Sequence, residues 1–238
     1  MKRQIINGTA LDIYEPNLVG RDMVCGDVHQ CWSKLQDQLD ELNFDETKDR
    51  LFSCGDETDR GPDWRLTLDY MAKPWYHSVM ANHTQMAIDW YDAQEGQGRP
   101  SMYGCESSWR YISNGGEWYL ELTQEQRKPY YEAFKGLPHR IQITSKGCPV
   151  HGPNPIGGEC TCTGIVHAQA SSDWLKPDDT FTMTWERFRI SQGDETGTKN
   201  IGQVFLGHTP VKQPLSLGNN RYIDTGAYYG HDFTIEEL

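Results

Sequence analysis

Two aspartates and an arginine lie close together in the stretch 55–61, Gly-Asp-Glu-Thr-Asp-Arg-Gly, directly after the apolar run 51–54. Aspartates are rarely buried without a partner, and the turn after a strand is where an α/β sheet presents polar side chains to a ligand. Carboxylate oxygens at such a turn are typical ligands of divalent metal ions. We therefore interpret Asp56 as a metal ligand, which requires further ligands elsewhere in the chain.

Other oxygen and nitrogen donors also lie at the ends of short apolar runs. With Asp56 they form a set of six candidate metal ligands, which are Asp27, His29, Asp56, Asn82, His167 and His208. Such donors suit borderline-hard divalent ions such as Mn2+, Fe2+ or Zn2+. Six donors are enough for two ions about 4 Å apart that share a carboxylate, and a water held between two such ions becomes hydroxide near neutral pH. Asp56 is our candidate for the shared ligand.

Alternating strands and helices must position these donors. The apolar runs predict strands at residues 23–25, 51–54, 76–80, 140–144, 164–168, 203–207 and 221–224. Apolar residues at helical spacing predict helices at about 32–42, 62–71 and 124–134, with further helix near 86–90 and 109–122. Residues 1–20 read as a hairpin or arm. The pattern predicts a βαβ arrangement in which the polar groups converge at strand ends.

Composition limits the classes of partner. The 22 Lys and Arg residues against 34 Asp and Glu residues give a net charge of −12, and no basic cluster offers a stripe for duplex DNA or RNA. The N-terminus has no apolar signal segment, and no apolar run approaches the roughly 20 residues needed to cross a bilayer. We expect one cytoplasmic domain over residues 1–238 that does not bind membranes. Residues 92–110 are expected to form a lid loop.

The 146–163 segment contains four further candidate ligands in the order C-x2-H-x8-C-x-C. They are Cys148, His151, Cys160 and Cys162. They could bind a structural Zn2+ ion, remain as unliganded loop thiols, or include a disulfide. The sequence leaves these three alternatives open.

Three short motifs carry a resemblance to a known family. The segments Gly-Asp-Val-His at 26–29, Gly-Asp-Glu-Thr-Asp-Arg-Gly at 55–61 and Asn-His at 82–83 resemble the phosphoesterase motifs GDxHG, GDxxDRG and GNHE of the phosphoprotein phosphatase (PPP) metallophosphatases. Segments 74–76, 82–86, 114–118, 207–210 and 222–227 resemble the bacteriophage lambda-type branch of that family. The resemblance runs from about residue 22 to the C-terminus. It implies an α/β (α+β) calcineurin-like metallophosphoesterase fold, a two-sheet β-sandwich flanked by helices with a dinuclear metal site at strand ends.

The resemblance also implies roles for single residues. One ion would be held by Asp27, His29, Asp56 and His208, and a second ion by Asn82 and His167 with Asp56 shared. His83 would be the general acid that protonates the leaving oxygen, and Asp59 would orient its imidazole. Arg60, and Arg187 in the segment Trp-Glu-Arg at 185–187, would bind the substrate phosphate.

The chain departs from the family pattern in two of the three motifs. Met80-Ala81 precedes Asn82 where the family has Arg-Gly, Thr84 stands where it has Glu, and Gln30 replaces a glycine. One phosphate-binding arginine is therefore missing. Replacements could come from a set of four other cations, which are Arg99, Arg110, Lys146 and Arg189.

The resemblance implies a hydrolase that acts on phosphomonoesters, namely a serine/threonine or dual-specificity protein phosphatase. Its substrate would be a phosphorylated protein or a small phosphoester, its ions Mn2+, with Fe or Zn as alternatives, and its setting the cytoplasm of a bacterium infected by a bacteriophage. The missing arginine keeps two alternatives open. One is a metallophosphoesterase acting on nucleotide polyphosphates or phosphodiesters, and the other is a metal-binding interaction protein that has lost catalysis.

Overall fold

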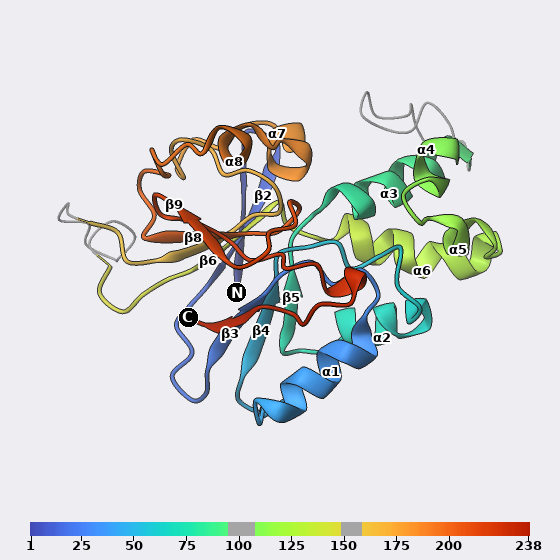
Figure 1. The fold of residues 1–238 in the computed structure, drawn as a ribbon, viewed down its shortest axis with the longest axis horizontal. Coiled ribbons are helices and arrows are strands. Elements are labelled where there is room, and N and C mark those ends of the chain that lie inside the picture. Colours follow the sequence, from blue (N-terminus) through green and yellow to red (C-terminus); the bar gives the residue numbers. More distant parts are fainter. Residues whose placement is uncertain (95–107, 149–158) are drawn as a thin grey trace.

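Two β-sheets packed face to face form the centre of the protein (Figure 1). The structure is a computed structural model that describes residues 1–94, 108–148 and 159–238. Within these residues the larger sheet has seven strands, in the spatial order β1 (Lys2–Ile6), β2 (Thr9–Tyr14), β6 (Arg140–Ile143), β7 (Thr163–Ile165), β8 (Gln203–Leu206), β10 (Asn220–Tyr222) and β9 (Leu215–Leu217). The smaller sheet has four, in the order β11 (Ile235–Glu237), β3 (Asp22–Cys25), β4 (Arg50–Ser53) and β5 (Tyr76–Ser78). The expected two-sheet sandwich flanked by helices is confirmed.

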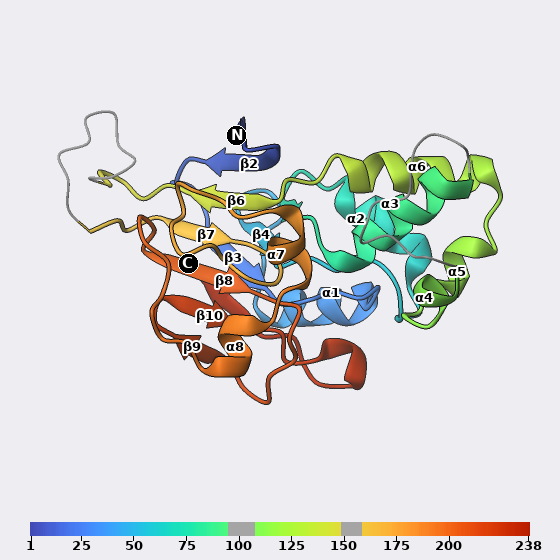
Figure 2. The same ribbon diagram turned by 90° about the horizontal axis from the view of Figure 1, so that it is seen from above.

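Helices cover the outer faces of the sheets and gather beside them (Figure 2). They are α1 (Trp32–Glu41), α2 (Thr67–Met71), α3 (Asn82–Gln94), α4 (Ser108–Ile112), α5 (Glu117–Leu120), α6 (Gln124–Lys135), α7 (Thr180–Trp185) and α8 (Phe188–Gln192), with 3-10 turns at Trp64–Leu66 and Ala227–Tyr229. Trp32 and Leu35 of α1 pack against Leu51 on the smaller sheet. Helices α3 to α6 form a separate helical lobe around their own apolar cluster, which includes Met86 and Phe134.

The core between the sheets holds the strand ends in place. Val24 and Phe52 of the smaller sheet pack against Ile141, Ile165 and Phe205 of the larger one, and all five side chains are almost fully buried. Burying a side chain of this kind contributes roughly 1.5–3 kcal/mol. The turns that follow these strands therefore rest on a rigid base.

Strand direction brings the polar turns together. Strands β3, β4 and β5 are parallel and in register, with Cys25 opposite Ser53 and Ser53 opposite Ser78. Strands β7, β8 and β10 are also parallel to one another. The carboxyl ends of both sets lead into turns that carry candidate ligands, as the alternation of strands and helices predicted.

Some elements differ from the sequence prediction. The N-terminal hairpin forms, but β2 is also a buried strand that pairs in parallel with β6. Helices α7 and α8 were not predicted, because the segment Thr-Phe-Thr-Met-Thr-Trp is rich in β-branched threonine, a weak helix former. Asp179 caps α7 by accepting a hydrogen bond from the Thr182 amide at 2.8 Å. Most of the expected lid, residues 95–107, lies outside the described residues. None of the described helices combines the length and apolar character that a membrane span requires.

His139 links β2 to β6 and is expected to make the fold acid-labile. Its Nδ1 accepts the Ala10 amide at 3.1 Å, and its own amide donates to the Ala10 carbonyl at 2.9 Å. Burial, with the charges of Arg140 and Arg3, lowers the pKa of His139 to about 4. The fold thus favours the neutral ring, so the stabilisation is complete above about pH 6.5 and is lost as pH falls through about 4.

Urea unfolding between pH 7 and pH 4 measures this loss. The wild-type protein should lose roughly 1–2 kcal/mol more stability over this range than His139→Gln, whose side chain can still accept the Ala10 hydrogen bond. His231→Gln, at an exposed position, is the matched control and should keep the wild-type slope. Equal slopes for wild type and His139→Gln would contradict the prediction.

Candidate active site

The turns after the strands hold residues in a left-handed backbone conformation. Among the described residues, nine non-glycine positions have positive φ, and six of them lie in these turns: His29, Gln30, Asp56, Asp59, Arg60 and His208. Such backbone costs about 1–3 kcal/mol per residue and persists only where the surroundings enforce it. Here the His29 amide donates to the Asp56 carbonyl at 2.6 Å, tying the first turn to the second. The observed strain marks this edge of the sandwich as a functional site.

Gly55 allows the second turn to approach its neighbours. Its φ is +111°, and a Cβ atom there would lie 2.8 Å from the Ala81 Cβ and 2.9 Å from His167 Nδ1. A larger residue would push the His167 ring out of place. The glycine therefore positions a histidine from the other sheet.

In each of three histidines, one ring nitrogen donates a hydrogen bond to a backbone carbonyl. His29 Nδ1 donates to the Thr58 carbonyl at 3.2 Å, and His167 Nδ1 donates to the Cys54 carbonyl at 2.8 Å. His208 uses its other nitrogen, Nε2, to donate to the Trp185 carbonyl at 3.1 Å. A carbonyl only accepts, so each ring carries its proton on the outer nitrogen and keeps a lone pair on the inner one. This backbone support is typical of histidines that bind metal.

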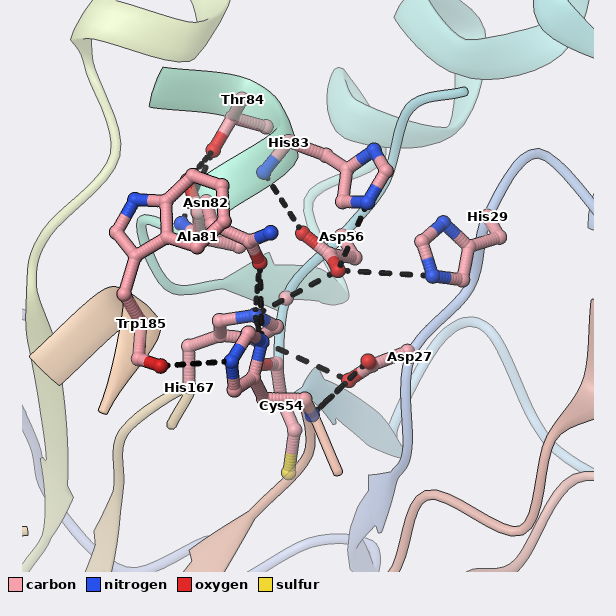
Figure 3. Close-up of polar contacts among 12 residues, drawn as sticks. Asp27, His29, Cys54, Asp56, Ala81, Asn82, His83, Thr84, His167 and Trp185 are labelled. Carbon is pink, nitrogen blue, oxygen red and sulfur yellow. Dashed lines mark hydrogen bonds and ion pairs between the residues drawn. The ribbon is translucent and has the colours of Figure 1, made fainter. Parts of the chain in front are cut away.

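The inner nitrogens of His167 and His208 face each other and the side-chain oxygen of Asn82. Asn82 Oδ1 lies 2.8 Å from His167 Nε2 and 3.1 Å from His208 Nδ1, and the two ring nitrogens are 3.1 Å apart. Asp56 Oδ2 is 3.5 Å from His167 Nε2, as Figure 3 shows. Acceptors this close need a cation among them, so this donor set fits a divalent metal ion.

A second group of donors shares Asp56 with the first. Asp56 Oδ2 lies 3.5 Å from His29 Nε2 and 4.0 Å from His83 Nε2, so it stands between the two groups (Figure 3). The side chain of His208 lies with Asn82 and His167, and not with His29. We expected His208 to share an ion with Asp27 and His29, and the geometry moves it to the other group. Asp27 accepts the His208 backbone amide at 2.9 Å.

The charges at the site are unbalanced. Burial raises the pKa of Asp27 well above its usual range, and the nearby charges of Asp224 and Asp56 raise it further. Burial also raises the pKa of Asp224 to about 6. For Asp56, burial acts to raise the pKa, but the surrounding histidines lower it below its usual range. Three buried carboxylates among neutral imidazoles form a site that divalent cations would neutralise.

His83 and Asp59 form a buried pair beside these groups. His83 Nδ1 lies 2.8 Å from Asp59 Oδ2, and both side chains are almost completely buried. The His83 amide also donates to Asp56 Oδ1 at 3.1 Å (Figure 3). His83 Nε2 faces the shared Asp56 carboxylate, while Asp59 fixes Nδ1 of the same ring. This is the arrangement of an oriented acid–base group.

Comparison with known proteins agrees with this geometry. The family model for the calcineurin-like phosphoesterase matches residues 21–231. The chain belongs to the calcineurin-like phosphoesterase family. Over 221 residues it is 30% identical to serine/threonine-protein phosphatase 1 of Salmonella typhimurium, covering 90% of both chains. It is 32% identical over 214 residues to serine/threonine-protein phosphatase 2 of the same organism, covering 86% of this chain and 87% of the relative. These matches confirm the resemblance to the PPP family.

More distant relatives share the fold. The chain is 26% identical over 245 residues to a bis(5'-nucleosyl)-tetraphosphatase of Bacillus mycoides, covering 89% of this chain and 87% of the relative. The solved structure of a cold-active protein-tyrosine phosphatase of a psychrophilic Shewanella superposes with a TM-score of 0.54 at 17% identity, covering 98% of this chain and 78% of that one. At that identity the superposition shows the calcineurin-like fold alone.

This phosphoesterase has three residues at the site that were not predicted from the sequence, which are Tyr111, Trp118 and Asp224. Trp118 Nε1 donates to Asp59 Oδ1 at 2.9 Å, and the Tyr111 hydroxyl donates to the same oxygen at 3.2 Å. The Arg60 amide donates to the Gly115 carbonyl at 3.4 Å, so the α4–α5 turn packs against the turn at residues 55–61. The only signal in the sequence was that segment 114–118 resembles the lambda-type branch. That resemblance did not indicate that Trp118 contacts Asp59. Asp224, in segment 222–227, was missed in the same way.

Trp118 is expected to position Asp59, and through it His83. In Trp118→Phe the ring remains but the hydrogen bond to Asp59 is lost, so kcat toward a phosphoserine peptide should fall about 10-fold. Trp90→Phe, another tryptophan in the helical lobe, is the matched control and should keep kcat within about two-fold. The check is steady-state kinetics with matched unfolding curves. Equal losses in both variants would show a merely structural role for Trp118.

The four described arginines that were candidates for phosphate binding differ in their exposure and contacts. Arg60 Nη1 donates to His29 Nε2 at 2.8 Å, so its guanidinium reaches the ligand groups. Arg187 is exposed and donates through Nη2 to the His208 carbonyl at 3.1 Å. Arg110 is exposed and stacks on the Trp185 ring, 4.8 Å from its centroid. Arg189 is buried, with hydrogen bonds to Asp194 and to backbone carbonyls, so it cannot replace the missing arginine.

The remaining candidates lie elsewhere. Lys146 is exposed on the segment that follows β6, at the opposite end of the sheet from His167, and Arg99 lies outside the described residues. Met80 is 5% exposed within the apolar cluster of the helical lobe, where its sulfur accepts the Thr84 hydroxyl at 3.4 Å. Met80 thus contributes to packing. Of the three described candidates for replacing the arginine, Arg110 contacts Trp185, whose carbonyl accepts a hydrogen bond from His208.

Proposed function

We propose that this calcineurin-like phosphoesterase is a metal-dependent phosphoprotein phosphatase that hydrolyses phosphomonoesters of serine and threonine. One observation carries the proposal: two donor groups share the Asp56 carboxylate beside the buried His83–Asp59 pair. The identity of about 30% to two Salmonella serine/threonine phosphatases over most of each chain supports the substrate class.

The metal assignment combines the two donor groups with the family resemblance. Asp56 and His29 would hold one ion together with Asp27, which the resemblance adds to this group. A second ion would be held by Asp56 and three neighbouring donors, which are Asn82, His167 and His208. When bound, such ions lower the pKa of a water molecule and polarise phosphoryl oxygens. We propose Mn2+ as the native ion, because carboxylate and imidazole donors without thiolates suit it; Fe2+ and Zn2+ are the alternatives.

The chain's own residues then bind the substrate and move a proton. Arg60 and Arg187 flank the donor groups, and their planar guanidinium groups can each bind two oxygens of a phosphate. Asp59 accepts the Nδ1 proton of His83 and fixes the ring, so a proton on Nε2 can pass to the leaving serine oxygen. Burial of this pair keeps bulk water from competing for the proton.

A substrate panel tests the proposal. With Mn2+ present, the protein should release phosphate from a phosphoserine peptide with kcat/KM at least 10-fold above that for a dinucleoside tetraphosphate or bis-p-nitrophenyl phosphate. The same panel is repeated with Fe2+ and Zn2+ to identify the preferred ion. Higher activity on the tetraphosphate or diester would overturn the assignment in favour of the nucleotide alternative. Background turnover with every ion would favour a binding protein without catalysis.

The comparisons favour the protein phosphatase over the nucleotide alternative. The tetraphosphatase relative has lower identity to this chain than the two protein phosphatases have. A phosphorylated protein is therefore the proposed partner. A cytoplasmic setting in a phage-infected bacterium stays a prediction from the sequence.

Arg110 is expected to contribute to substrate binding. A charge-assisted hydrogen bond to phosphate contributes about 1.5–3 kcal/mol, so Arg110→Gln should raise KM for a phosphoserine peptide about 10-fold with little change in kcat. Arg65→Gln is the matched control, because Arg65 is also an exposed arginine stacked on a tryptophan, 4.1 Å from the Trp64 ring centroid. Similar KM values for all three proteins would show that Arg110 does not contact the substrate.

A further inference from the structure

Three cysteines meet at the end of the larger sheet opposite the active site. Cys148 follows β6, while Cys160 and Cys162 precede β7, so two separate arms of the chain supply the sulfur atoms. The three Sγ atoms lie within 4.8 Å of one another, and those of Cys148 and Cys160 are 3.5 Å apart. Cys148, Cys160 and Cys162 form no disulfide in the structure. His151, the fourth expected ligand of this segment, lies outside the described residues.

The spacing of the sulfur atoms fits a single metal ion. Zinc binds thiolates at about 2.3 Å in a tetrahedron, which places neighbouring sulfurs roughly 3.8 Å apart. The Cys148 and Cys160 sulfurs, 3.5 Å apart, are close to that spacing, and the Cys162 sulfur lies within 4.8 Å of both. A disulfide would instead require about 2.05 Å between two sulfurs. The cluster therefore needs only small side-chain shifts to coordinate an ion.

Hydrogen bonds fix the backbone of each arm separately. The Cys148 amide donates to the Ser145 carbonyl at 3.2 Å across a turn in which Gly147 has φ +74°. On the other arm, the Cys162 amide donates to Cys160 Sγ at 3.4 Å, a contact that stabilises a thiolate. The Gly202 amide in turn donates to the Cys162 carbonyl at 2.9 Å. These contacts hold the sulfur atoms where they are.

Two of the three cysteines are buried in an apolar part of the protein. Cys148 and Cys162 are 3% and 0% exposed and belong to the apolar cluster under the larger sheet, with Trp174. A divalent ion neutralises the thiolates that bind it, so thiolate ligands can remain in such an apolar place.

We propose that Cys148, Cys160 and Cys162 bind one structural zinc ion, which joins the two arms next to β6 and β7. Thiolates select zinc over the harder ions suited to the carboxylate and imidazole site. The three thiolates would occupy three of the four tetrahedral positions around the ion. The site is distinct from the active site, because β7 separates Cys162 from His167.

Metal analysis of the full chain tests the proposal apart from the phosphatase activity. The Asp56→Asn protein, whose active-site ions should be lost, is expected to retain one zinc per chain. Adding Cys160→Ser should lower this zinc below 0.1 per chain, whereas adding Thr161→Ser, a conservative change between the two cysteines, should leave it unchanged. Absence of zinc from Asp56→Asn protein would overturn the proposal.

Two further measurements test for zinc binding without changing a cysteine, in case the cysteine variant does not fold. Cobalt substitution of the Asp56→Asn protein should give the near-ultraviolet absorption of sulfur-to-cobalt charge transfer. The three cysteines should resist alkylation until a chelator is added. An intact mass that shows a disulfide between Cys148 and Cys160 would also overturn the proposal.

Discussion

Asp56→Asn is expected to remove the phosphatase activity and most of the bound active-site metal. The carboxylate stands between two donor groups, 3.5 Å from His29 Nε2 and 3.5 Å from His167 Nε2. An amide offers one neutral oxygen in place of two charged ones, so it cannot serve both groups. Metal activation of phosphoryl transfer contributes several kcal/mol, and losing about 4 kcal/mol corresponds to a fall of roughly 10^3-fold in kcat/KM.

Kinetics and elemental analysis on the same samples check this expectation. Asp37→Asn, an exposed aspartate on α1, is the matched control and should keep full activity and metal content. Phosphate release by Asp56→Asn at the wild-type rate, with two ions still bound, would refute the assignment of the shared ligand.

His83→Asn is expected to slow only those reactions whose leaving group needs a proton. His83 Nδ1 is held by Asp59, and its Nε2 faces the donor groups. General acid catalysis contributes about 10^2–10^4-fold, so kcat for a phosphoserine peptide, which releases an alkoxide, should fall by that factor. The stable leaving group of 2,4-dinitrophenyl phosphate needs no proton, so its kcat should fall less than about 10-fold.

The ratio of the two rate losses is the decisive measurement. His77→Asn changes a half-buried histidine that contacts Tyr14 and Phe52 away from the site, and it should leave the ratio at its wild-type value. Metal content should stay unchanged in His83→Asn. If both substrates slow equally, His83 acts on binding or folding and not as the acid.

The sequence predicted the donors of the site better than their grouping. Asp27, Asp56 and Asn82 follow regular apolar runs, and strand ends meet at one edge of a sheet, so their convergence could be predicted. The group that contains His208 depends on which ring nitrogen is held by the Trp185 carbonyl, a tertiary contact that no local pattern encodes.

The support around Asp59 could not be predicted for a similar reason. Tyr111 and Trp118 lie more than 50 residues from Asp59 in the chain and have the spacing of ordinary core residues. Helix α7 was missed because its threonines disfavour the helix that tertiary packing and the Asp179 cap impose. In both places long-range contacts decided the structure.

The left-handed turns of the site have a consequence for the evolution of stability. Outside these turns, the other positive-φ positions among the described non-glycine residues are Asn7, Asn43 and Asn200, a residue type that tolerates this conformation. Gln30 and Arg60 are not among the residue types that favour it, and glycine or asparagine there would relieve strain. Selection for heat resistance without selection for turnover would therefore favour replacing these residues. A thermostable laboratory lineage of this protein would drift toward an inert fold unless each round also demanded catalysis.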